Sequence, residues 1–242
     1  MKPDITILDS CTSTNSVLNG LPDAADCTVI ATHTQTAGRG QRGNSWEAEP
    51  GKNLTFSMLF RPTSLEAARQ FELSMIVSLA IADAIDSRLP EGIRTTIKWP
   101  NDIYIGLEKV CGILIENKLA GRNIERAIAG VGINVNQTEF LSDAPNPTSI
   151  ILHKGGATTD LTQFLTDVTS RMADYAARYF ASPEPTALKS EYMSRLMWTD
   201  GTHPFRDADG TFTARITDVA LDGILTLSNG RQYAFKEVAY II

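Results

Sequence analysis

Apolar and polar positions change their spacing along the chain, and the changes mark out elements. Apolar runs at 28–32, 54–60 and 93–97 are bounded by turn residues and predict strands. Two further apolar runs, 110–116 and 125–136, predict a hairpin that turns near Gly121. Because the strands do not alternate regularly with helices, the pattern favours a mixed sheet over a doubly wound parallel one.

Apolar residues at helical spacing predict a wide-faced core helix through 71–85 and an amphipathic helix through 161–179. Thr63–Glu66 has the sequence of a capping box, so the core helix is expected to open there, and Asp160 is expected to cap the amphipathic one. Shorter helices are predicted at 16–20 and 188–196, the first capped by Ser13 or Thr14.

The pattern changes again beyond Trp198, where short β segments alternate with turn sequences such as Asp222-Gly223 and Asn229-Gly230. We therefore expect an α+β fold with two domains. The first, residues 1–190, is a mixed β-sheet catalytic domain with packed helices, and the second, residues 191–242, is a small C-terminal β-barrel.

Composition narrows the class of protein. Of 242 residues, 43% are hydrophobic and 21% are charged, which is typical of a globular protein that buries a core. The net charge of −6 argues against nucleic acid as a general partner. Three scattered cysteines, the absence of a signal peptide and the lack of a membrane-spanning apolar run predict a reduced cytoplasmic protein without membrane contact.

The stretch 34–46 concentrates three glycines and two arginines, which suits an anion cradle. It spells a dinucleotide fingerprint, but no helical pattern follows it, and it spells a P-loop start, but Asn44 replaces the required lysine. A flexible surface loop is the alternative interpretation. The polar cluster 9–15 has two equally good interpretations, as a helix cap or as a ligand site lined by hydroxyls.

A second polar group surrounds the turn Lys98–Asp102, with Lys109 before the next strand and glycines in Gly130–Asn134. Each feature has a structural alternative, namely an aromatic anchor, a solvated strand end and the end of a strand. Together with Arg39 and Arg42 they supply charge and rings without a histidine-activated nucleophile. That combination favours phosphoryl or nucleotidyl transfer between bound substrates.

These motifs have a known order. The chain resembles biotin protein ligases over about residues 9 to 136, and its turn-rich end looks like their small C-terminal barrel. The matching segments are Ser13-Thr14-Asn15, Gln35 to Gly40 with Gly43 and Trp46, Lys98–Asp102, Lys109 to Glu116, and Gly130–Asn134.

The resemblance implies a two-step reaction that uses ATP and Mg²⁺. Biotin and MgATP would give biotinyl-5′-AMP, and a lysine of a biotin carboxyl carrier domain from a biotin-dependent carboxylase would then attack this anhydride. Because the polar cluster starts nine residues from the N-terminus, we expect the form without a DNA-binding domain. The alternatives are a lipoate or octanoate protein ligase or transferase of the related fold, and a non-catalytic biotin-binding module.

The resemblance also implies roles for individual residues. Biotin would be bound by Ser13, Thr14, Asn15, Gln35, Gly38, Arg39, Gly40, Gln41, Lys109 and Gly112. ATP or the adenylate would be bound by Arg42, Trp46, Lys98, Asn101 and Asn134, of which Asn134 would also contact the metal. The catalytic group would be Arg39, Lys98, Asp102 and Lys109, with Asp102 orienting or deprotonating the acceptor lysine. Gln41 and Asn44 depart from a pattern that is often basic, which implies a weaker hold on the adenylate.

Overall fold

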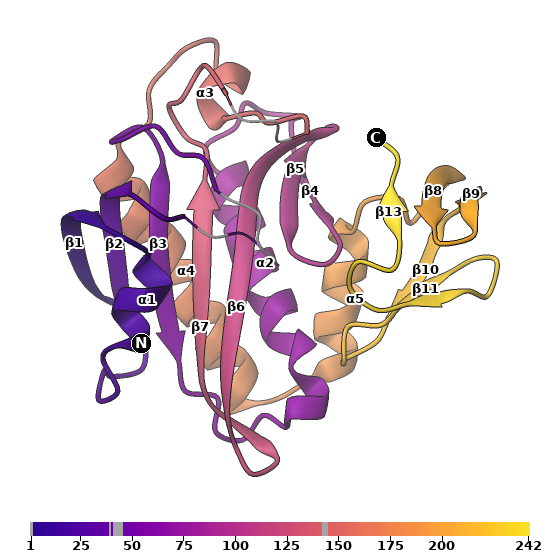
Figure 1. The fold of residues 1–242 in the computed structure, drawn as a ribbon, viewed down its shortest axis with the longest axis horizontal. Coiled ribbons are helices and arrows are strands. Elements are labelled where there is room, and N and C mark those ends of the chain that lie inside the picture. The colour runs from indigo at the N-terminus through magenta and orange to yellow at the C-terminus, as the bar shows by residue number, and fades with distance from the viewer. Residues whose placement is uncertain (1, 39, 41–45, 142–144) are drawn as a thin grey trace.

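The computed structural model describes residues 2–38, 40, 46–141 and 145–242 of the chain (Figure 1). Within these residues, the main sheet has seven strands in the order β1-β2-β3-β7-β6-β5-β4. Its strands are β1 (Asp4–Cys11), β2 (Thr28–Gln35), β3 (Leu54–Phe60), β4 (Thr95–Lys98), β5 (Asp102–Ile105), β6 (Glu108–Ala120) and β7 (Asn123–Ile133). The sheet is mixed, as predicted, because β1 and β2 run parallel while the other neighbours are antiparallel.

Two pairings bring distant segments together. The long hairpin of β6 and β7 turns at Gly121, whose φ of +61° suits glycine. Strand β7 then pairs with β3, with Phe56 opposite Val131, so the N-terminal third of the chain lies beside this hairpin. The segment after β1 is thereby placed next to the middle of the sheet.

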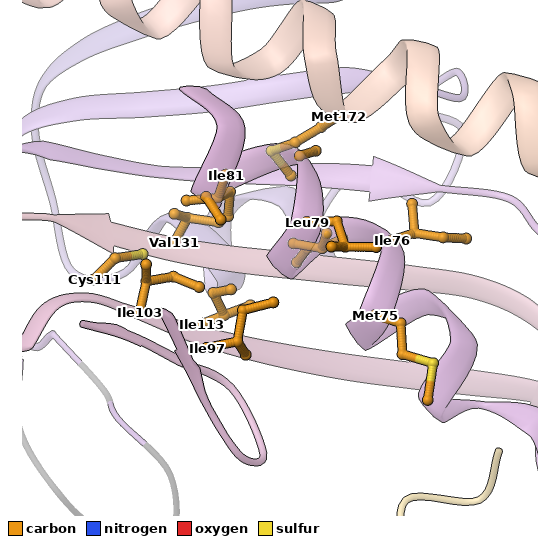
Figure 2. Close-up of a cluster of buried hydrophobic side chains, with 14 of the residues drawn as sticks. Met75, Ile76, Leu79, Ile81, Ile97, Ile103, Cys111, Ile113, Val131 and Met172 are labelled. Atoms are coloured by element: carbon orange, nitrogen blue, oxygen red, sulfur yellow. The ribbon is translucent and has the colours of Figure 1, made fainter. Parts of the chain in front are cut away.

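Helices cover both faces of the sheet unequally. Helices α2 (Phe71–Asp86) and α4 (Leu161–Ala181) pack on one face, and the short α1 (Thr14–Asn19) lies on the other (Figure 1). Helix α2 is buried on almost every side, as expected of a helix that is apolar all round. Its residues Met75 and Leu79 belong to the same buried core as the sheet residues Ile97, Ile113 and Val131 (Figure 2).

The C-terminal part follows the short α3 (Ile150–His153) and α5 (Pro185–Arg195). Among the described residues it forms two antiparallel sheets of three strands, ordered β10-β11-β12 and β13-β8-β9. These strands are β8 (His203–Asp207), β9 (Gly210–Ala214), β10 (Ile216–Val219), β11 (Leu225–Leu227), β12 (Gln232–Tyr233) and β13 (Ala239–Tyr240). The predicted fold class, an α+β domain with a small C-terminal β unit, is confirmed. The boundary at 190/191 falls within α5 and stays a prediction.

The predicted start of the core helix is wrong. Helix α2 begins at Phe71 and not in the capping box Thr63–Glu66, and a single 3-10 turn precedes it. The backbone of this segment bonds the β6–β7 turn instead, since Ile124 N donates to Leu65 O and Ala67 N to Arg122 O. Asp160, in contrast, caps α4 as predicted by accepting from the Gln163 amide at 3.0 Å.

Within the described ranges, each helix is too short or too polar to cross a membrane.

Candidate functional site

A cavity of about 1010 Å³ opens on the face of the sheet that carries α1. Segments far apart in the chain line it, which is why the sheet order matters. The lining comes from the start of α1 (Ser13, Thr14, Asn15), the end of β2 (Gln35), the loop residues Gly40 and Trp46, the β4–β5 turn (Lys98 to Asp102), β6 (Lys109, Gly112 to Leu114), β7 (Gly130 to Gly132), Asn134 and the C-terminal residues Lys236 and Val238 to Tyr240.

The start of α1 forms one end of the cavity. Thr14 and Asn15 are buried, and the Thr14 amide donates to Gln35 Oε1 at 2.9 Å. Strand β1 delivers this segment alongside β2, because Thr36 N donates to Cys11 O at 2.9 Å just before it. Ser13 occupies the N-cap position, but its side chain makes no capping bond. The capping interpretation of these hydroxyls is therefore wrong for Ser13.

Two lysines face the cavity in different surroundings. Lys109 Nζ forms an ion pair with Asp102 Oδ1 at 2.7 Å, and both side chains are mostly buried. Lys98 Nζ instead lies over two rings, 4.7 Å from the centroid of Tyr240 and 5.6 Å from that of Tyr104. Such contacts attract an ammonium group without neutralising it. One lysine is thus charge-paired before any ligand binds, while the other rests on aromatic faces.

Burial lowers the pKa of Lys98 below its usual value. The nearby charge of Asp102 opposes this effect, and the like charge of Lys109 adds to it. The direction is that of an ammonium removed from water and not fully compensated by a counter-ion. An anionic ligand would supply the missing charge.

Glycines form the floor under Trp46. A Cβ on Gly132 would overlap the Trp46 indole, and one on Gly112 would lie 3.0 Å from it. The same ring has Lys109 Nζ 5.7 Å from its centroid, and its Nε1 is buried without a hydrogen-bond partner among the described residues. Glycine usually weakens a strand, and a close side-chain approach explains it at these two positions. The space beside Gly112 is bordered by Trp46 and Lys109. The predicted contact of Gly112 with biotin stays a prediction.

Asn134 and Asn101 are anchored differently. Asn134 is 4% exposed and donates through Nδ2 to Thr148 O at 2.9 Å, which leaves its buried Oδ1 without a partner in the described part of the chain. Asn101 donates its amide to Ile113 O and so ties the β4–β5 turn to β6. An unpartnered amide oxygen is a ligand type that Mg²⁺ accepts, and Mg²⁺ commonly takes few protein ligands beside phosphates and water. The residue type at Asn134 and its unpartnered Oδ1 therefore fit the ion.

The structure brings most of the predicted site residues together. Those that line the cavity are Ser13, Thr14, Asn15, Gln35, Gly40, Trp46, Lys98, Asn101, Asp102, Lys109, Gly112 and Asn134. Gly38 lies beside them, because a Cβ there would come within 2.9 Å of Gln35 Nε2. Arg39, Gln41, Arg42 and Asn44 lie outside the described residues, so the predictions about them stay predictions.

Sequence reasoning missed some residues at the site. Tyr104 and Tyr240 border Lys98, and the fully buried Ser57 bonds both Thr14 and Asn15. Tyr240 belongs to a C-terminal strand of two residues, too short to be recognised from a pattern. Ser57 lies in a strand that is buried at every position, where the hydroxyls of Thr55 and Ser57 were usable hints.

Comparisons with known proteins agree with this geometry. The model of the Biotin/lipoate A/B protein ligase family matches residues 8–134. The bifunctional ligase/repressor BirA of Bacillus spizizenii is 28% identical over 211 residues, which cover 85% of this chain and 62% of that protein. The biotin–[acetyl-CoA-carboxylase] ligase of Paracoccus denitrificans is 34% identical over 126 residues, or 51% of each chain. The chain thus spans less than two thirds of the length of these relatives.

A solved structure shares the fold over nearly the whole chain. The biotin protein ligase from Aquifex aeolicus in complex with biotin and ATP superposes with a TM-score of 0.80 at 23% identity, covering 98% of this chain and 97% of that one. At this level of identity the likeness shows the fold.

Proposed function

Since the chain belongs to the Biotin/lipoate A/B protein ligase family, we propose that it is a biotin protein ligase. It activates biotin with MgATP to biotinyl-5′-AMP and then transfers biotin to a lysine of a biotin carboxyl carrier domain. The family description covers both biotin and lipoate, so it does not choose between them. The relatives that are named as biotin ligases support biotin as the substrate. No covalent enzyme intermediate is required, because both steps join groups on bound substrates.

The observation that supports this proposal most strongly is the convergence of the motifs. Four segments that are separate in the sequence, ending in Asn15, Asp102, Gly112 and Asn134, line one cavity. Hydroxyl and amide groups gather at one end of it, and the lysines and Trp46 lie beyond them. A polar pocket followed by a cationic region suits a molecule with a polar ring and an anionic tail.

In the first step, the protein aligns a carboxylate with the α-phosphate. Lys109 holds the carboxyl end of biotin, and Lys98, which has no ion pair in the described part of the chain, contacts the phosphate. Arg39 and Gln41 would close over the adenylate, Arg42 would bind it, and Trp46 would lie beside the adenine. Catalysis by alignment and charge stabilisation is sufficient in principle, since positioning supplies roughly 7–11 kcal/mol.

Mg²⁺ would be held by the free Oδ1 of Asn134 together with ATP oxygens. When bound, it neutralises charge on the phosphates and so favours attack by the carboxylate. Asn101 positions the β4–β5 turn at the same place.

In the second step, Asp102 orients the acceptor lysine. Its Oδ1 already receives Lys109 at 2.7 Å, which shows that the carboxylate can hold an ammonium group at the cavity. Positioning is the main role we assign, because carboxylates are weak bases toward an amine.

The cytoplasm is the proposed location, and a carrier domain is the proposed protein partner. Cys11, Cys27 and Cys111 are all free thiols, which suits a reducing compartment. Burial raises the pKa of Cys27 to about 11, so this thiol is a poor nucleophile.

The test is incubation of the protein with biotin, MgATP and a biotin carrier domain, followed by intact-mass measurement. We expect the carrier to gain one biotin and pyrophosphate to be released. Biotin binding without pyrophosphate release would identify a binding module. Modification of a lipoyl carrier by lipoate or octanoate, with the biotin carrier unmodified, would identify the related lipoate activity.

A further inference from the structure

A chain of hydrogen-bonded polar groups runs from buried residues at the cavity wall to the exposed Glu116. Asn15 Nδ2 donates to Glu116 Oε2 at 2.7 Å, and Ser57 Oγ lies 2.5 Å from Asn15 Oδ1 and 2.7 Å from Thr14 Oγ1. Ser57 is fully buried, while Thr14 and Asn15 are 3% and 4% exposed. Thr14 and Asn15 line the large cavity, whereas Ser57 and Glu116 do not.

The carboxylate at one end gives this chain a direction. An ionised carboxylate only accepts hydrogen bonds, so Asn15 must present its NH₂ group to Glu116 and its carbonyl oxygen to Ser57. That carbonyl carries no proton, so the single hydroxyl proton of Ser57 is used there. Ser57 therefore accepts at its contact with Thr14, and the Thr14 hydroxyl is the donor in that contact.

The consequence appears at the cavity wall. The Thr14 proton is taken up by Ser57 Oγ at 2.7 Å, with Gln35 Oε1 at 3.4 Å as a longer alternative, so in both cases it is not available to a ligand. Only lone pairs of the Thr14 hydroxyl then remain for a ligand, which must bring an N–H or O–H group to this point. A buried acceptor left without a donor is costly, so the arrangement discriminates between ligands.

The position of Asn15 leaves little freedom. A Cβ on Gly130 would overlap the Asn15 amide, so the absence of a side chain there allows this close approach. On the far side, Asn15 and Glu116 both line a second cavity of about 370 Å³ between α1 and the β6–β7 hairpin. The Asn15–Glu116 bond thus lies between the two cavities and fixes the amide from behind.

We propose that Ser57 and Glu116 are positioning residues for the Thr14 hydroxyl. Glu116 orients the Asn15 amide, Asn15 takes the Ser57 proton, and Ser57 then takes the Thr14 proton. The Thr14 hydroxyl is left as an acceptor and so selects a ligand with a donor group. The inference rests on the proposed function and deepens it. The cyclic urea of biotin has two N–H groups, while the dithiolane ring of lipoate has none. The chain of hydrogen bonds therefore selects biotin over the other ring substrate that the family description names.

The test measures biotin affinity by calorimetry for the full-length Ser57→Ala and Glu116→Gln variants. Ser57→Ala frees the Thr14 proton, and Glu116→Gln allows the Asn15 amide to turn either way. We expect the Kd for biotin to rise about tenfold in each, with the KM for ATP unchanged within about twofold. Matched controls are Ser78→Ala, a buried serine whose Oγ has no partner among the described residues, and Glu125→Gln, a carboxylate on the same hairpin.

A double-mutant cycle separates this role from simple support of the fold. If Glu116 acts through Thr14, then Glu116→Gln should weaken biotin binding by less than about twofold further in a Thr14→Val background. The proposal would be overturned if the losses of biotin affinity in Thr14→Val and Glu116→Gln multiplied in the double variant. It would also be overturned if Ser57→Ala and Glu116→Gln both kept the biotin affinity and melting temperature of the unmodified protein. Absence of biotin binding by the unmodified protein would instead overturn the proposed function.

Discussion

Lys98 and Lys109 lie near the same carboxylate, that of Asp102, but have different electrostatic surroundings in the cavity. Lys109 forms the ion pair with the carboxylate, and Lys98 lies on Tyr104 and Tyr240 with no ion pair among the described residues. Residues of the same type therefore have different expected behaviour when they are replaced or titrated.

Replacement of Lys109 by alanine should reduce adenylate formation about ten- to a hundred-fold, because a charge-assisted contact worth about 1.5–3 kcal/mol is lost. Pyrophosphate exchange at subsaturating biotin and ATP measures this effect. Lys118→Ala is the matched control, since Lys118 lies on the same strand, is 65% exposed and pairs with Glu125. Equal exchange rates for the Lys109 variant and the unmodified protein would remove Lys109 from the proposed machinery.

Lys98 should show itself in the pH dependence. Burial lowers its pKa below the ordinary 10.5, so it loses its proton at a pH where an exposed lysine keeps it. Pyrophosphate exchange should therefore fall as pH rises through that lowered pKa, and Lys98→Arg should remove the fall because guanidinium stays charged.

The stability contribution of Lys98 has the opposite sign. Between its lowered pKa and 10.5 the unfolded chain holds the proton and the folded one does not, so the free energy of unfolding gains from this group as pH rises. Denaturant titrations over the same pH range check the sign.

For the activity prediction, a fall of pyrophosphate exchange at alkaline pH that persists in Lys98→Arg would assign the titration to another group.

Sequence reasoning succeeded where a residue belongs to a short polar motif and failed where its role depends on a partner far away. Lys98 and Asn134 line the cavity as expected, because charged or amide groups crowd around turns and strand ends, while their roles stay predictions. Ser57 was missed because its importance comes from Asn15, and Tyr240 because it meets Lys98 only through tertiary packing. Such contacts leave no spacing pattern in the chain.

At the scale of elements, β7 can pack against Trp46 only because it lacks a side chain at Gly132. Gly132→Ala should cost about 1–3 kcal/mol of unfolding free energy, since the new Cβ overlaps the indole. In a Trp46→Ala background the same change should cost less than about 0.5 kcal/mol. Urea titrations of the four proteins measure both values, and equal costs in the two backgrounds would show that the clash lies elsewhere.

Strand β13 brings the ring of Tyr240 to the cavity, where it lies over Lys98. Tyr240→Leu removes a contact worth about 0.5–2 kcal/mol, so kcat/KM for ATP should fall by up to roughly thirtyfold. Tyr240→Phe keeps the ring and should retain nearly full activity. A loss in the phenylalanine variant equal to that in the leucine variant would point to the hydroxyl and not to the ring.

Two elements illustrate why element prediction stopped short. Strand β1 contains polar residues at several positions and is largely exposed, so its apolar pattern is weak and parallel pairing with β2 defines it. Strand β5 has four residues and directly follows a turn motif, which masked it. The capping box before α2 failed because backbone groups near Leu65 found strand-like partners in the β6–β7 turn. In each case tertiary pairing overrode a local signal.

At the scale of the whole molecule, Trp99 connects the main sheet to the C-terminal part. Its Nε1 donates to Gly223 O at 3.0 Å, and its ring lies 5.3 Å from that of Phe235. The surface-anchor interpretation of this tryptophan is wrong, because it is 2% exposed. The turn that carries Lys98 and Asp102 thus also contacts the C-terminal part through Trp99. The geometry of the cavity therefore depends on the main sheet and on the C-terminal part.

The net charge of −6 gives a prediction for the whole molecule. We expect no sequence-specific binding of this chain to DNA at physiological salt, because phosphate binding needs clustered basic residues. Fluorescence anisotropy with labelled duplexes, with and without biotin, measures it. A biotin-dependent complex on the promoter of the organism's own biotin genes would contradict the expectation.

The pairing of β3 with β7 also sets the order in which a ligand can help the protein during synthesis. Residues around Asn15 leave the ribosome long before Glu116 and Gly130, which complete the same wall. A ligand stabilises only a state that binds it. Biotin should therefore protect the finished chain from unfolding but give the nascent chain no help until the β6–β7 hairpin has emerged, and chaperones would have to cover that interval.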